Sequence, residues 1–136
     1  MHKELTCYID GLITMASSLS KKISHSGIYT TCFKNKNFKE ELYKHYKLSL
    51  NNLIKENQTL KEILSLYLEE NLVNSLIDLL EHDLGKEINI STIQNKEELE
   101  KLSCFKGGKV PFYFVEEFYI VEYKDYFLCL IMGNNE

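Results

Sequence analysis

Residues 110–132, with the sequence VPFYFVEEFYIVEYKDYFLCLIM, constrain the fold more than any other part of this chain. The segment is rich in Phe, Tyr, Ile and Val, the residues that favour β-strands. Lys124 and Asp125 interrupt it and predict a turn, so we expect a β-hairpin or short meander in which Tyr123 pairs with Tyr126. Because side chains alternate along a strand, this pairing assigns every residue of the hairpin to one of two faces.

Both faces of the predicted hairpin are apolar. The first, the Phe face, collects Phe112, Phe114, Phe118, Ile120, Phe127, Cys129 and Ile131. The second, the Tyr face, collects Tyr113, Val115, Tyr119, Val121, Tyr123, Tyr126, Leu128, Leu130 and Met132. An antiparallel sheet with one solvated face alternates apolar with polar side chains, so we expect both of these faces to be covered. The Phe face suits a dry core under helices, whereas the polar tip of Tyr suits a surface that is partly wet or meets a partner.

The N-terminal part of the chain predicts a helix. Residues 3–25 carry apolar side chains at helical spacing. This periodicity outweighs the pair Asp10-Gly11, which by itself is typical of a hairpin turn. We therefore expect a helix that ends near Gly27, with Thr6 and Cys7 on its polar side.

Three later segments begin with the spacing of a capping box, in which a polar side chain and a carboxylate three residues on satisfy the free amides of a helix start. These pairs are Asn37 with Glu40, Thr59 with Glu62, and Asn95 with Glu98. They predict helices over 37–56 and 60–84 and a short one through 102. The apolar stripe of 60–84 changes sides, so we place a break or sharp bend at 69–71. Strands are expected at 28–33 and 87–92. Residues 107–109 are expected to form a flexible lead into the hairpin.

The order of the elements predicts an α+β fold in one domain over residues 1–136. Its N-terminal helices pack on one face of a small antiparallel sheet, which the C-terminal hairpin or meander mainly forms. No apolar run reaches the roughly 20 residues that a bilayer span requires, so no membrane contact is expected. Glu4 and Asp10 lie where a signal peptide would be apolar. We therefore expect a cytoplasmic protein.

The charge pattern argues against nucleic acid as a partner. All 16 basic residues are lysine, and the formal net charge is −4. Arginine supplies the planar fork that binds phosphates and guanine edges in pairs of hydrogen bonds. A chain without arginine and with net negative charge lacks the basic clusters on which phosphate affinity rests.

The residues that could carry chemistry form weak patterns. Asp78 and His82 lie four apart on a predicted helix, as metal ligands can, but this is also the ordinary spacing of a solvated helix face. The four cysteines, Cys7, Cys32, Cys104 and Cys129, show no zinc-type spacing and are expected to be free thiols. Glu116 and Glu117 are adjacent in a strand and would act together only across a bulge. No cofactor or metal is expected.

These observations favour a small protein without catalysis that binds another protein. The leading hypothesis is a homodimer through the Tyr face, with the candidate interface residues Tyr113, Tyr119, Val121, Tyr123, Tyr126, Leu128 and Leu130. One alternative is a sensor with a small-molecule pocket between the Tyr face and helix 60–84. A second alternative is an enzyme that uses His82 or a cysteine.

Overall fold

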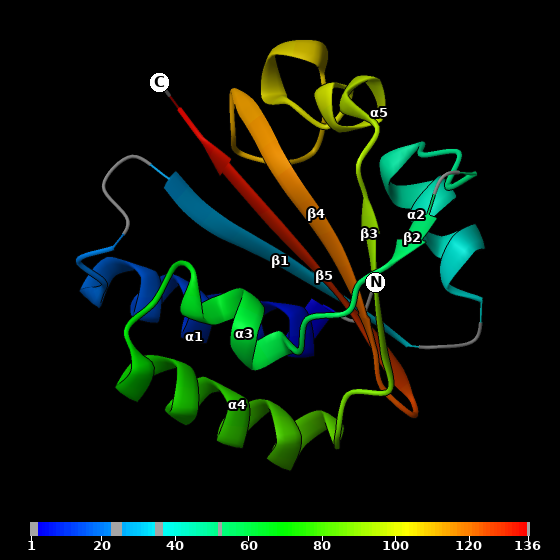
Figure 1. Cartoon of the computed structure of the whole chain (residues 1–136). Helices are drawn as coiled ribbons and strands as arrows, with labels where there is room; N and C mark the ends of the chain where they lie inside the picture. Colours follow the sequence, from blue (N-terminus) through cyan, green and yellow to red (C-terminus); the bar gives the residue numbers. More distant parts are fainter. Residues whose placement is uncertain (1–2, 23–25, 35–36, 52, 136) are drawn as a thin grey trace.

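The computed structural model describes residues 3–22, 26–34, 37–51 and 53–135. Within these ranges the fold is α+β, as the sequence predicts (Figure 1). The elements follow in the order α1 (Lys3–Leu19), β1 (Ser26–Lys34), α2 (Phe38–Tyr46), β2 (Leu53–Lys55), α3 (Leu60–Ser65), α4 (Glu70–Leu84), β3 (Asn89–Ile93), α5 (Lys96–Glu100), a 3-10 helix η1 (Cys104–Lys106), β4 (Phe114–Glu122) and β5 (Tyr126–Asn134).

The predicted hairpin is the centre of the sheet. The described strands form a 5-stranded antiparallel sheet in the order β1-β5-β4-β3-β2, so β4 and β5 both have neighbours on each side. The backbone amide of Tyr123 donates to the carbonyl of Tyr126 at 2.7 Å. The turn therefore lies at Lys124 and Asp125, and the predicted register is confirmed from the turn back to the pair of Glu117 with Met132.

The two faces of the hairpin lie in two separate cores. α1, α3 and α4 cover the Tyr face, and α2 and α5 lie on the opposite side of the sheet (Figure 1). The Tyr-face core joins the helices to Tyr119, Val121, Tyr123, Leu128, Leu130 and Met132. The Phe-face core joins α2, α5 and the segments around them to Phe118, Ile120, Phe127, Cys129 and Ile131. Both faces are therefore covered, as their apolar sequence requires, and the chain's own elements cover them.

α1 packs beside β1, an outer strand of the sheet, and its side chains bond to the strand's backbone. The Thr6 hydroxyl donates to the Cys32 carbonyl at 3.0 Å and accepts from the Cys32 amide at 2.9 Å. One turn further along, the Asp10 carboxylate accepts from the Thr30 amide at 3.4 Å. Thr6 is buried for this reason, although the helical pattern placed it on the polar side. Side chains of α1 thus take the place of a neighbouring strand.

Two predicted helices are shorter than the periodicity suggests. α1 ends at Leu19 and Gly27 is already in β1, while residues 23–25 lie outside the described residues. α2 ends at Tyr46, where Lys47 adopts a left-handed conformation with φ 59°. The chain then turns into the Phe-face core and continues as β2, in place of a helix to residue 56; residue 52 of that prediction also lies outside the described residues.

The expected break in 60–84 is present. α3 ends at Ser65 and α4 begins at Glu70, so the helix is interrupted just before the predicted position. Thr59 makes the capping box with Glu62, and Asn95 caps α5, both as predicted. The break allows both halves of the segment to pack their apolar stripes into the same Tyr-face core.

Candidate binding cleft

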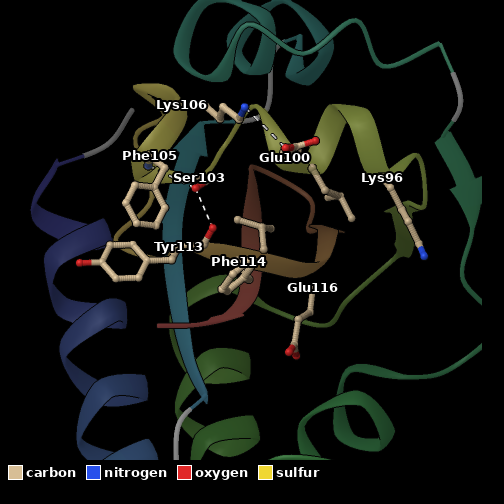
Figure 2. A pocket seen from close by; sticks show the side chains of 10 residues that line it. Lys96, Glu100, Ser103, Phe105, Lys106, Tyr113, Phe114 and Glu116 are labelled. Carbon is tan, nitrogen blue, oxygen red and sulfur yellow. Dashed lines mark hydrogen bonds and ion pairs between the residues drawn. The ribbon is translucent and has the colours of Figure 1, made fainter. Parts of the chain in front are cut away.

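A cleft with a volume of about 460 Å³ lies between the start of β4 and the segment formed by α5 and η1 (Figure 2). Three aromatic side chains at its rim are exposed to solvent: Phe105 by 70%, Phe114 by 54% and Tyr113 by 42%. The rings of Phe105 and Tyr113 stack with their centroids 4.2 Å apart. Leu99 and Val115 complete the apolar lining. Exposed aromatic side chains gathered in a concave site are typical of binding surfaces.

The segment that carries Phe105 is held by several hydrogen bonds. The Ser103 hydroxyl donates to the Tyr113 carbonyl at 2.8 Å and accepts from the Phe105 amide at 3.2 Å. The Gly108 amide donates to the Ser103 carbonyl at 2.9 Å. A Cβ at Gly108 would lie 2.0 Å from the carbonyl oxygen of Leu102, so this position requires glycine. The expected flexible lead into the hairpin is therefore a folded loop that fixes the aromatic rim.

A β-bulge at Glu116 determines which side chains reach the cleft. Residue pairing between β4 and β5 shifts between Val115 and Glu117, so Glu116 is an extra residue. A shift of one residue moves the preceding side chains of the strand, Phe114 and Val115, to the opposite faces. Val115, assigned to the Tyr face from the sequence, accordingly packs against the Phe-face core. Phe114 moves to the other side, where it is more than half exposed.

The cleft lies along the edge of β4. β3 pairs with β4 only over residues 118–122, so in the described part of the chain residues 114–117 have a strand neighbour on the β5 side alone. Four consecutive residues, 113–116, line the cleft. A pocket above one face of a strand would be lined by every second residue, because side chains alternate between faces. The consecutive lining therefore indicates a cleft beside the backbone edge.

Carboxylates lie at one end of the cleft. A smaller pocket of about 230 Å³ shares Lys96, Leu99 and Glu116 with the cleft, and its lining also includes Glu56 and Glu117. In Figure 2 the Lys96 side chain points away from Phe114 and the centre of the cleft. On the same wall, the Nζ atom of Lys106 in η1 lies 3.7 Å from the Glu100 carboxylate. The pocket that adjoins the cleft thus has an acidic lining.

Glu117 is fixed by two tyrosines. Its Oε2 atom accepts hydrogen bonds from the Tyr119 hydroxyl at 2.7 Å and from the Tyr67 hydroxyl at 2.9 Å. Burial, followed by the hydrogen bond to Glu117, raises the pKa of both hydroxyls above the ordinary value of 10.0. These tyrosine hydroxyls on the Tyr-face side are satisfied within the chain, where the sequence suggested water or a partner.

The structure places most of the predicted interface residues in the core. Tyr119, Val121, Tyr123, Leu128 and Leu130 are between 0% and 6% exposed and pack under α1, α3 and α4. Tyr126 is half-buried at the margin of the same core. Tyr113 alone of the seven candidates lines the cleft. Side chains of the Tyr face and of 60–84, the two walls of the small-molecule pocket that the sequence offers as an alternative, pack in this same core.

Of the predicted polar pair, His82 contacts a different carboxylate from the expected one. The His82 side chain is 85% exposed, and its Nδ1 atom lies 3.3 Å from the carboxylate of Asp83, its chain neighbour, in place of Asp78. Among the residues that the structure describes, no group of three or more His, Cys, Asp or Glu side chains could hold a metal ion.

The described cysteines are free thiols in two environments. Cys7 and Cys104 are exposed, while Cys32 and Cys129 are buried. Burial raises the pKa of the Cys32 thiol to about 12 and raises that of Cys129 as well. Cys129 therefore behaves as a small apolar residue of the Phe-face core, as the sequence suggested.

Comparison with known proteins gives no relative for this chain. No protein-family model, curated protein or solved structure matches it. The described residues also include no helix that is both long enough and apolar enough to cross a membrane.

Proposed function

We propose that this chain is a cytoplasmic protein without catalysis that acts by binding another protein, and that the cleft beside β4 is its contact surface. The observation that carries the proposal is the group formed by Phe105, Tyr113 and Phe114. The three side chains are large, exposed and gathered at one concave site. Aromatic residues of this kind dominate the binding energy of protein interfaces when a partner removes them from water.

The rim is also ordered before a partner arrives. Stacking holds Phe105 against Tyr113, and Ser103 ties the backbone of both residues together. Side chains and loops that are already fixed lose little conformational freedom on binding, so more of the contact energy contributes to affinity. This arrangement favours a binding role over a purely structural one for the exposed rings.

A small apolar molecule is the second candidate ligand, because the volume of about 460 Å³ falls within the usual range for ligand pockets. The exposure of the rim favours a protein. Small-molecule sites usually bury most of their ligand, roughly 70–90% of its surface. Phe105 and Phe114 lie on an open rim, where a larger partner would cover them more completely.

The test is selection of peptides from a random display library against the immobilised protein. We expect the selected peptides to bind the parent and to lose binding to Phe105→Ser. The matched control is Ile88→Ser, which removes an equally exposed apolar side chain (62%) from the segment between α4 and β3. Binding that depends on Ile88 as much as on Phe105, or no selected peptide at all, would overturn the proposal. Fluorescence of an anilinonaphthalene dye that falls in Phe105→Ser, without any peptide binding, would favour the small-molecule candidate.

A further inference from the structure

We infer that the cleft takes its partner as an added β-strand: an extended segment of another protein pairs with residues 114–117 of β4 and carries an apolar side chain next to a lysine or arginine. This inference rests on the proposed function, for which it specifies the binding mode and the chemistry of the partner.

In the described part of the chain, no strand pairs with 114–117 on the side away from β5. β3 ends its ladder with the pair Ile93 and Phe118, and the chain then leaves the sheet to begin α5 at Lys96. Figure 1 shows β3 and β4 diverging toward α5. The open stretch is about 13 Å long at roughly 3.3 Å per residue, enough for a short added strand. Extended peptides bind in this way at exposed sheet edges, with main-chain hydrogen bonds along one side and pockets for alternate side chains.

The cleft has the shape that such a strand needs. Its lining by the consecutive residues 113–116 places it beside the backbone, where an added strand would run. α5 and η1 form the opposite wall, to which α5 contributes the buried Leu99 and η1 the exposed Phe105. Alternate side chains of the added strand would therefore contact the apolar lining, while its backbone pairs with β4.

Charge specifies the second feature of the partner. A strand that extends past the aromatic rim reaches the adjoining pocket with Glu56, Glu116 and Glu117 in its lining. A cationic side chain placed there gains favourable interactions with the carboxylates, and interactions of this type contribute to specificity and depend on salt. The apolar cleft and the acidic pocket together fit a segment with an apolar residue followed by a basic one.

The same charges disfavour a second copy of this chain as the occupant. An antiparallel pairing of 114–117 with itself, centred on the two-fold axis, would place Glu117 opposite Phe114 and Glu116 opposite Val115. Glu116 of each copy would then lie diagonal to Glu117 of the other copy on the same face of the new ladder, roughly 7–8 Å away. Like charges at this separation repel each other, most strongly at low salt.

The experiment uses a peptide selected on the parent protein as described above. We compare its affinity with that of an analogue N-methylated at alternate backbone amides, which keeps the side chains and removes main-chain donors. Two analogues cover the two sets of alternate amides. We expect one of the two to bind at least about tenfold more weakly than the unmodified peptide, since each unmade backbone hydrogen bond leaves a polar group unsatisfied. Amide hydrogen exchange of 114–117 should slow when the unmodified peptide binds.

Charge is tested with Glu116→Lys, with Glu81→Lys on α4 as the control for the same change of charge at an exposed, distant position. We expect selected peptides to be enriched in Lys or Arg, and their affinity to fall about tenfold in Glu116→Lys but not in Glu81→Lys. Binding that requires Phe105 but is insensitive to N-methylation and to Glu116→Lys would overturn this inference and leave the proposed function intact. Loss of the dependence on Phe105 would overturn both. A parent dimer that Glu116→Lys dissociates would show that a second copy occupies the edge, which also overturns the inference.

Discussion

Val121→Lys distinguishes a Tyr face that is core from a Tyr face that meets a second chain. Val121 is 0% exposed and pairs with Ile90 on β3 and with Leu128 on β5, beneath the helices. Loss of a fully buried Val side chain removes about 1.5–3 kcal/mol of hydrophobic stabilisation. An unpaired ammonium in its place costs several kcal/mol more. The total of about 5–8 kcal/mol is comparable to the whole stability of a domain, roughly 5–15 kcal/mol.

We therefore expect Val121→Lys to unfold the chain or to lower its melting temperature by at least about 10 °C, as measured by circular dichroism. Size-exclusion chromatography with light scattering gives the molecular mass of parent and variant. The control is Ile88→Lys, which makes the same chemical change at an exposed side chain and should leave the melting curve nearly unchanged. A Val121→Lys chain that keeps its melting temperature and loses a dimer would refute the burial argument and restore the Tyr face as an interface between chains.

Three further predictions follow from burial, titration and close contact. Cys7 and Cys104 should react with a thiol reagent in the native protein, whereas Cys32 and Cys129 should react only on unfolding. Cys32 and Cys129 are buried, and burial raises the pKa of their thiols. Equal reaction rates of all four thiols in the native protein would contradict this. Burial raises the folded-state pKa of Tyr46, Tyr67, Tyr119 and Tyr123 above 10.0, so the folded state keeps these protons to higher pH than the unfolded state does. The free energy of unfolding from urea titrations should therefore fall as pH rises above about 10, and it should fall less in Tyr119→Phe. A fall confined to pH below 9 would argue against this. Gly108→Ala should lower the melting temperature and the affinity of Phe105-dependent peptides, since the added methyl would collide with the Leu102 carbonyl. Gly11→Ala is the control. Its new carbon would meet no atom from elsewhere in the fold within 4 Å, so it should lower neither quantity.

The register of the hairpin could be predicted because it depends on local pattern. Alternation on both sides of Lys124 and Asp125 fixes the pairing of Tyr123 with Tyr126, and the structure has that pairing. The capping box at Thr59 and the N-cap at Asn95 are local in the same sense. Each requires only residues that are close in the sequence, so composition and spacing carry the information.

What covers each face could not be predicted, because the answer depends on contacts between distant segments. The hairpin pattern indicates that the Tyr face is covered, but it does not distinguish a second chain from α1, α3 and α4. The tyrosines of the Tyr face suggest a wet boundary, yet the hydroxyl of one of them, Tyr119, donates to Glu117 within the same chain. A tyrosine therefore indicates a need for a polar partner and not where that partner comes from.

The cleft was missed for a specific reason. The sequence indicated that Glu116 and Glu117 would act together only across a bulge, and the structure has a bulge there. A regular strand would place Phe114 on the Phe face and Val115 on the Tyr face. With a bulge at Glu116, the side chains of Phe114 and Val115 exchange faces, which predicts an exposed Phe114 and draws attention to this edge. Phe105 gave no such signal, because the folded loop that positions it depends on contacts with Leu102 and Tyr113.

The strand order has a consequence for how the protein is made. β5 pairs with both β1 and β4, and it is the last of the described strands to leave the ribosome. Until residues 126–134 emerge, β1 lacks the one strand that it pairs with in the described part of the chain, and one side of β4 is unpaired. The pair of Ser26 with Asn134 joins positions 26 and 134, which are 108 residues apart. Pairings between residues so far apart in the sequence slow folding, and unpaired apolar strands aggregate. The bonds from α1 to β1 protect one edge of the unfinished sheet, and the other edge of β1 stays open during synthesis until β5 inserts.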